Sequence, residues 1–325
     1  MRINFEKRNF SLGAIMKSYT ILLLMPLFLL ASCGESQDQS GQVPQETMNS
    51  GSFTVYCESG ISALLESPLA NYQKDYPNVK LTIKTVNSRQ AMSFLLSGQA
   101  RVALIARDYL HDEDSLMKVY KVTPHQRMKM CDDALVFFVK EDNPIKRILD
   151  DNQLRDYFTN RNAKFSDVNI EPKNSLEKPE FIIQSHLSSE YANLDKMVAK
   201  GKKIEIPLKF MSSPDSVKNY VAEHSNAIGI GYLSQIWKDI RFKAIDIGFH
   251  DSSGAYIYPQ IVHQGNIVQK KYPYIVPIYA YMLEDRRNLP WWFGIYLSKE
   301  GKIQKYFLDA GLVPGYAIIK GIQEE

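Results

Sequence analysis

Short apolar runs alternate along the chain with polar turns and with segments of helical periodicity. Residues 79–86 alternate apolar and polar side chains as a half-buried strand does, and the polar residues 87–89 then precede a predicted helix at 90–97. Residues 53–57 and 102–106 are further runs of strand length. The repeated order of strand, polar turn and helix indicates an α/β fold with an open sheet, whose ligand lies beyond the carboxyl ends of the strands.

The first helix is expected to start well after the first strand. Residues 58–62 form a polar stretch that we predict as a loop, and Ser67-Pro68 follows it. Serine is a preferred helix cap, and proline is favoured at the first helical position. The sequence therefore predicts a helix that begins at Pro68.

The second half of the chain repeats the pattern. A polar stretch at 185–189 again separates a predicted strand from a predicted helix. Apolar strands are predicted at 134–139, 181–183 and 227–232, and helical stretches at 153–158, 191–199 and 217–222. After residue 255 we predict strands around Val262 and Ile278, and one amphipathic helix at 291–309.

An apolar run at residues 19–30 follows Lys17 and ends in the order Leu30-Ala31-Ser32-Cys33. A positive flank, a short apolar segment and small residues before a cysteine are typical of a lipoprotein signal peptide. We therefore predict a signal peptide at 1–32, lipidation of Cys33 and a flexible tether at 33–52, with the mature chain held on a bacterial membrane and facing the periplasm or the cell exterior. An N-terminal anchor helix that is never cleaved is the alternative.

Removal of residues 1–32 changes the charge balance. It takes away four of the 39 basic residues and one of the 36 acidic residues, so 35 of each remain. A neutral mature chain argues against a nucleic-acid partner. Cys57 and Cys131 are the other two cysteines, and they either form one disulfide bond or stay as two separately buried thiols.

Several segments late in the chain carry a family resemblance. Residues 272–279 resemble the motif Tyr-Pro-x-x-Arg-Pro-Leu-Tyr, with valine at the arginine position, and residues 310–314 resemble a Gly-x-Val-Pro ending. Residues 227–232 and 297–302 resemble an Ala-Ile-Gly-Tyr strand and a closing helix of the same family. On these segments the chain is similar, from residue 53 to residue 314, to the PstS-like phosphate-binding proteins that serve phosphate ABC importers.

The resemblance implies an α/β fold of the periplasmic binding protein-like kind (type II), in which two lobes are each a mixed sheet flanked by helices. The lobes would comprise residues 53–135 with 250–325, and residues 136–249. The chain would cross between them near 135–139 and again near 245–254.

The resemblance also implies where a ligand binds. Family members hold an oxyanion with hydroxyls and backbone amides at helix starts, and with a carboxylate that accepts a proton from the anion. Asp108 would take this last role, and Arg89 and Arg107 would be the cations. The fourth loop, at 184–190, lacks the arginine, glycine and threonine of the family. The matching positions are Ser59, Gly60, Ile61, Ser62, Ser88, Arg89, Arg107, Asp108, Ser188 and Ser189.

Each of these residues also has a purely structural interpretation. The serines are common cap and turn residues, and Arg107 with Asp108 would form a solvated ion pair at a strand end. His186 is either a donor that replaces the missing arginine or a surface residue. Residues 111–114 are either metal ligands or, as we expect, the acidic first turn of a helix. Residues 291–293 are aromatic and favour core packing over an exposed stacking patch.

The leading functional hypothesis is a lipid-anchored, monomeric solute-binding protein that captures a small oxyanion, foremost inorganic phosphate, and delivers it to the permease of an ABC importer. It would have no enzymatic activity, metal or cofactor. The alternative is a sensory or partner-binding lipoprotein of the envelope on the same fold, with an altered or lost phosphate site. A hydrolase is disfavoured, because the sequence has no Gly-x-Ser-x-Gly, no His-Glu-x-x-His and no Ser-x-x-Lys supported by partner motifs.

Overall fold

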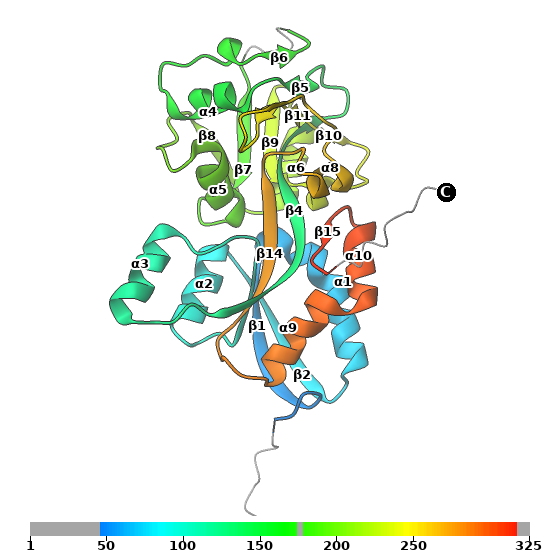
Figure 1. Cartoon of the computed structure of the whole chain (residues 1–325). Helices are drawn as coiled ribbons and strands as arrows, with labels where there is room; N and C mark the ends of the chain where they lie inside the picture. The colour runs from blue at the N-terminus through cyan, green and yellow to red at the C-terminus, as the bar shows by residue number, and fades with distance from the viewer. Residues whose placement is uncertain (1–45, 174–177, 317–325) are drawn as a thin grey trace, which may run out of the picture. The chain divides into compact units, whose positions relative to one another are not determined.

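A ten-stranded mixed sheet organises the computed structural model, which describes residues 46–173 and 178–316 (Figure 1). The alternating run at 79–86 is a strand, as predicted, and pairs in parallel with the first strand of the chain. Along the main path the strands follow in the order β2 (Val79–Val86), β1 (Gly51–Glu58), β3 (Val102–Ile105), β14 (Ile275–Met282), β4 (Gln126–Lys140), β9 (Ala227–Tyr232), β7 (Glu180–Gln184) and β8 (Leu208–Met211).

The long strand β4 belongs to both portions of this sheet. Its residues 126–134 pair antiparallel with β14, whereas Leu135 to Phe138 pair antiparallel with β9. Parallel strands β1, β2 and β3 lie beyond β14, and parallel strands β7, β8 and β9 lie on the other side of β4. Strand β4 therefore pairs with β14 along its first part and with β9 along its second part.

The chain returns between the two portions directly beside β4 (Figure 1). Ile275 is in register with Ala134, and the Leu135 amide donates to the Tyr274 carbonyl at 2.9 Å. The Tyr272 hydroxyl donates to the Leu135 carbonyl at 2.8 Å. The two passages of the backbone are thus hydrogen-bonded to each other.

Short strands complete the topology. Strands β10 (Phe242–Ala244) and β15 (Val313–Pro314) each pair antiparallel with a different stretch of β4. Separate small sheets are formed by β11 (Asp246–Ile247), β5 (Arg147–Ile148) and β6 (Ile170–Glu171), and by β12 (Phe249–His250) and β13 (Tyr256–Ile257).

Helices pack on both portions of the main sheet. On the β1 side these are α1 (Ser59–Asp75), α2 (Ser88–Leu96), α3 (His111–Tyr120), α9 (Leu289–Lys299) and α10 (Gly301–Asp309). On the β9 side they are α4 (Asp151–Thr159), a 3-10 turn (Phe165–Asp167), α5 (Ser189–Asn193), a π-helical turn (Leu194–Ala199), α6 (Pro214–Glu223) and α7 (Leu233–Ile236). Helix α8 (Gln264–Val268) is drawn near α6 in Figure 1 and contacts β15.

The late start predicted for the first helix is wrong. Helix α1 begins at Ser59, directly after β1, so residues 58–62 are not a loop, and Pro68 lies inside the helix. One buried stripe at helical spacing continues across the proline, and burial of that stripe outweighs the hydrogen bond that proline cannot make. The stripe consists of Ile61, Leu65, Leu69 and Tyr72.

Two further predictions near the C-terminus need correction. Val262 is buried but lies in an irregular segment, so no strand forms around it. The helix predicted at 291–309 is two helices, because the backbone of Glu300 is extended and caps a second helix that begins at Gly301. The predicted core packing of the aromatic residues holds for Phe293 and Phe307, which are fully buried, whereas Trp291 and Trp292 are only half-buried.

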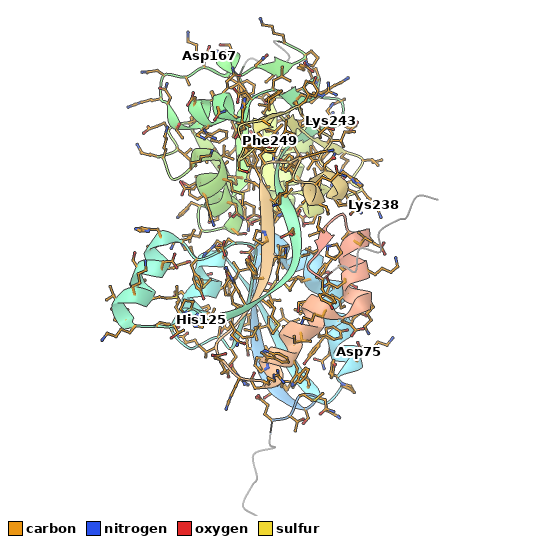
Figure 2. All side chains as sticks on the ribbon, viewed as in Figure 1. Asp75, His125, Asp167, Lys238, Lys243 and Phe249 are labelled. Carbon is orange, nitrogen blue, oxygen red and sulfur yellow. The ribbon has the colours of Figure 1, made fainter. Side chains whose placement is uncertain are left out.

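The end of α1 is fixed against α9 and α10. Tyr72 packs edge-to-face on Phe293 and on Tyr296. Asp75, labelled in Figure 2, accepts a hydrogen bond from the Tyr296 hydroxyl at 2.6 Å and pairs with Lys302. These contacts tie the first long helix to the last two.

Cys57 and Cys131 are both buried free thiols, so the alternative of two separate thiols is the one that the structure has. Burial raises the pKa of both thiols above the ordinary value.

The predicted signal peptide and the lipidated Cys33 lie outside the described residues. The end of the predicted tether lies inside them: Glu46 pairs with Arg101 at 2.5 Å, and Gly51 and Ser52 already belong to β1. Within residues 46–173 and 178–316, no helix has both the length and the apolarity to cross a membrane.

Candidate functional site

The four predicted ligand segments meet at the ends of β1, β2, β3 and β7. Gln184, at the end of β7, donates from Nε2 to the Ser59 hydroxyl at 2.7 Å. The Arg89 amide and the Ser88 hydroxyl both donate to the Leu187 carbonyl at 3.3 Å. We call this region the loop junction and define it as residues 58–62, 88–89, 106–108 and 184–193. It lies at the carboxyl ends of parallel strands, as the strand order predicts.

A buried carboxyl group, that of Glu58, lies at the centre of the loop junction. Glu58 is the last residue of β1 and is 1% exposed. Its Oε1 accepts hydrogen bonds from the Ala106 amide at 3.1 Å and from the Ser189 hydroxyl at 2.5 Å. Burial, and then the nearby carboxylate of Glu190, raise the pKa of Glu58 to about 8.

The carboxyl group of Glu190 lies against the first turn of α1. A Cβ added to Gly60 would stand 2.6 Å from Oε1 of Glu190, closer than any real side chain tolerates. The Gln235 amide group, through Nε2, donates to Oε1 of Glu190 and to the Gly60 carbonyl, each at 2.9 Å. Glu190 is 1% exposed, and burial raises its pKa. Glycine at position 60 is therefore what makes room for the carboxyl group.

A chain of buried hydrogen bonds connects the two portions of the sheet through these groups. The Tyr232 hydroxyl donates to the Ser189 hydroxyl at 2.6 Å, and Ser189 in turn donates to Glu58. The Asn193 amide donates to the Tyr232 hydroxyl at 3.0 Å and to the Ala106 carbonyl at 2.8 Å. Such connected networks stabilise one arrangement more than isolated pairs do.

Three buried oxygens of the loop junction have no hydrogen-bond partner in the described part of the chain: Glu58 Oε2, Glu190 Oε2 and Gln184 Oε1. All three are acceptors. Burial of a charged acceptor without a donor is costly, which favours the protonated form of the two carboxyl groups.

Both predicted cations are paired with carboxylates of α3. Arg107 is 2% exposed and binds Glu113 through two hydrogen bonds, at 2.7 and 2.8 Å. It also donates from Nε to the Ser88 hydroxyl at 3.0 Å. Arg89 pairs with Asp112 at 2.6 Å. Their charges are thus already compensated inside the protein.

Asp108 does not pair with Arg107. Its carboxylate pairs with Arg127 of β4 and with Lys196 of the π-helical turn, the latter at 3.3 Å. Asp108 is only half-buried and lies at the rim of the loop junction.

The predicted serines divide into two groups. Ser188 caps α5 by accepting from the Tyr191 amide at 3.2 Å, and Ser62 donates to the Ser59 carbonyl at 3.1 Å, so both make ordinary helix contacts. Ser59, Ser88 and Ser189 instead bond to side chains or backbone of another segment of the loop junction.

His186 is exposed and packs edge-on against Phe210, in agreement with its interpretation as a surface residue. It lines a cavity of about 300 Å³ beside the loop junction, together with Arg89, His111, Asp112 and Asp195. Residues 111–114 form the acidic first turn of α3, as expected, and the described residues contain no cluster of side chains suited to hold a metal ion.

Sequence reasoning did not identify Glu58, Glu190 and Gln235 as members of the site. Glu58 and Glu190 directly flank predicted ligand serines, but an acidic residue at a helix start is ordinarily solvated. Only the pairing of β1 with β3 and the position of α5 make them buried neighbours.

Residues 42–302 match a family described as the PBP superfamily domain. The chain therefore belongs to this family of periplasmic binding protein-like domains, and the predicted α/β fold class is confirmed.

Among individual proteins, the chain is 22% identical over 291 residues to the phosphate-binding protein PstS of Staphylococcus saprophyticus, covering 88% of this chain and 85% of that one. The phosphate-bound structure of a substrate-binding protein from Clostridium perfringens is similar with a TM-score of 0.63 and 15% identity, over 81% of this chain and 99% of that one. An ABC-type phosphate transport receptor from Vibrio cholerae gives a TM-score of 0.60 and 16% identity, over 81% and 100% of the two chains. The predicted resemblance to PstS-like proteins is confirmed.

Proposed function

We propose that this protein is a solute-binding protein of a bacterial cell envelope, anchored by lipid on Cys33, that captures a small oxyanion and delivers it to an ABC importer. Phosphate is the first candidate ligand. The observation that carries the proposal is the convergence of four segments, from four different strands, on the loop junction. The phosphate-binding relatives named above support the choice of ligand.

The binding step would use the N-terminal end of α1. This helix is seventeen residues long, and its first turn contains no acidic residue of its own. The unpaired amides at such an end carry about half a positive charge, which favours a bound anion. The hydroxyl of Ser59 and the backbone around Gly60 and Ile61 would supply neutral donors, and Asp108 would accept a proton from the anion at the rim.

Closure of two lobes around the ligand would be the function, with no chemical step. We propose the β1 side and the β9 side of the main sheet as these lobes. The change of partners along β4 supports the first predicted crossing, near residue 135. The pairing of Ile275 with Ala134 favours a second crossing near 272–275, later than the predicted 245–254, and would extend the second lobe to about residue 272.

One observation favours the second candidate, an envelope protein that senses or binds a partner without binding phosphate. The Ala106 amide and the Ser189 hydroxyl, both in predicted ligand segments, already donate to the carboxyl group of Glu58. A site that has its own carboxylates needs no external anion to satisfy these donors.

The test is calorimetric titration of the mature chain from residue 34, stripped of bound ligand, with phosphate, sulfate and organic phosphates. We expect saturable phosphate binding that Asp108→Asn weakens and that the surface control Asp142→Asn leaves unchanged. Absence of heat with every anion would reject oxyanion capture and leave the partner-binding candidate.

A further inference from the structure

We propose that the carboxyl group of Glu190 is an internal occupant of the anion position at the start of α1, and that an external oxyanion binds only after Glu190 withdraws. The inference deepens the proposed function and rests on it for the identity of the competing ligand. The occupancy itself is a property of the protein alone and is testable without phosphate.

The first support is the position of the carboxyl group. Both of its oxygens lie within 3.1 Å of where a Cβ of Gly60 would be, next to the second residue of α1. The helix supplies no acidic residue in its first turn, and its cap residue Glu58 makes no side-chain capping bond. The carboxyl group nearest the start of α1 therefore comes from the other side of the loop junction.

The second support is that the surrounding residues are shaped to hold Glu190. Gln235 donates from Nε2 to Glu190, while its Oε1 accepts from the Tyr232 amide at 3.1 Å. A Cβ on Gly231 would stand 2.4 Å from that Oε1, so a second glycine makes room for Gln235 as Gly60 does for Glu190. A chance contact would not need glycine at both positions 60 and 231, nor a Gln235 amide group that is fixed by hydrogen bonds at both its oxygen and its nitrogen.

The third support comes from the donors around the site. Glu58 accepts from the Ala106 amide and from the Ser189 hydroxyl, so two donors from the third and fourth predicted ligand segments are also engaged by a carboxyl group. Arg107, the buried cation of the loop junction, is bound by Glu113. An incoming anion would find these donors already engaged and the space beside Gly60 filled until Glu190 leaves.

The consequence is a competition between the Glu190 carboxyl group and an external anion for one position. While Glu190 occupies it, the two portions of the sheet are held together without ligand through Gln235, Ser189 and Asn193. Only the fraction of molecules with Glu190 withdrawn binds ligand, so the apparent affinity is lowered by that fraction.

The experiment measures the separation across the loop junction in the mature, ligand-free chain. Spin labels are attached at the exposed positions Lys118→Cys and Lys202→Cys of the chain that starts at residue 34. The native cysteines of this chain, Cys57 and Cys131, are both buried. We expect a predominantly short distance in the parent, and a longer, broader distribution in Glu190→Ala. Glu66→Ala, at an exposed position of α1, is the matched control and should behave as the parent.

Acetate provides the decisive addition, because it restores the missing carboxylate in a separate molecule. It should return Glu190→Ala to the short distance and leave Glu66→Ala unchanged. Phosphate should do the same in Glu190→Ala, with an affinity about tenfold higher than in the parent if about a tenth of parent molecules are open. Rescue by acetate without rescue by phosphate would retain the inference and reject phosphate as the ligand.

Should Glu190→Ala fail to fold, Glu190→Asp tests the same point. Its carboxylate is one methylene short of Gly60, so the open population should rise. An unchanged distance in whichever of these variants folds, or opening that acetate does not reverse, overturns the inference.

Discussion

At the scale of single residues, the absence of a side chain at Gly60 decides which group contacts the start of α1. The space that a Cβ would fill is taken by the carboxyl group of Glu190. The helix start at this position is therefore specified together with a residue far away in the sequence. Gly60 is needed here for close approach, since its backbone is not in the left-handed region.

Gly60→Ala should destabilise the protein by about 1–3 kcal/mol, because the new methyl group overlaps the Glu190 carboxyl group. Gly301→Ala is the control, since it also lies at a helix start but has open space around it, and alanine should be neutral or stabilise by up to about 1 kcal/mol. Urea unfolding measures both. In a Glu190→Ala background the cost of Gly60→Ala should disappear, and persistence of the full cost there would contradict the assigned contact.

Glu58 should make stability depend on pH. Its pKa is raised to about 8 in the folded protein by burial and by Glu190, against an ordinary value of 4.5. A group with a raised folded pKa stabilises the fold below its unfolded pKa, and this contribution is lost as pH rises through the folded pKa. The free energy of unfolding should therefore fall between about pH 4.5 and pH 8.

Glu58→Gln should reduce this fall above pH 6, and Glu190, whose pKa burial also raises, accounts for what remains. Asp133, whose pKa burial raises to about 6, accounts for part of the loss at lower pH and stays in the variant. Urea unfolding at a series of pH values compares the two slopes. Equal slopes from pH 6 to pH 8.5 in parent and variant would show that Glu58 does not titrate in this range.

The positions of three serines in the loop junction were predictable from the sequence, whereas those of the two glutamates were not. Ser59, Ser88 and Ser189 follow strand ends, and a local pattern is enough to place them at the edge of a sheet. The burial of Glu58 and Glu190 depends on which strands become neighbours and on where α5 comes to lie. No local pattern carries that information, because an acidic residue at a helix start has the same appearance when it is solvated.

At the scale of elements, one buried arginine after β3 joins α3 through an ion pair and α2 through a hydrogen bond. Arg107 follows β3, contacts Ser88 at the start of α2, and binds Glu113 of α3 through both terminal nitrogens. Truncation of one partner leaves the other as an uncompensated buried charge. The geometry of three elements thus depends on one guanidinium group.

Arg107→Met should destabilise the protein by about 3–5 kcal/mol, because Glu113 is left buried without its partner. Lys305→Met, which breaks an exposed pair with Asp309, should change stability by less than about 0.5 kcal/mol. Thermal and urea unfolding provide the comparison. The double variant Arg107→Met, Glu113→Met should recover part of the loss, and a double variant less stable than Arg107→Met alone would refute the ion-pair explanation.

Most strands and several helices were predictable because their patterns are local. The alternation at 79–86 and the apolar run at 227–232 end within a residue of β2 and β9. Helix boundaries were less predictable where tertiary burial opposed a local signal. Pro68 suggested a helix start, but the stripe from Ile61 to Tyr72 keeps the helix continuous through it.

At the scale of the whole molecule, ligand binding should appear as stability. A ligand that binds only the folded chain raises the free energy of unfolding, by about 2.7 kcal/mol at a concentration 100 times its Kd. We expect phosphate at that excess to shift the urea midpoint of the mature chain upward, and sulfate at equal ionic strength to shift it less. An identical midpoint with and without phosphate would mean that the folded chain does not take up this anion.

The paired passages of β4 and residues 272–282 have a consequence for the integrity of the chain. Their backbones are joined by a ladder of hydrogen bonds. The two portions of the sheet are therefore held together by these hydrogen bonds as well as by the continuous chain. A chain cut in the irregular segment 258–263, where Ile261 is 73% exposed, keeps both passages intact as separate strands. The two fragments should then associate and fold together, so the protein is suited to division into a split pair whose reassembly reports on contact between two fused partners.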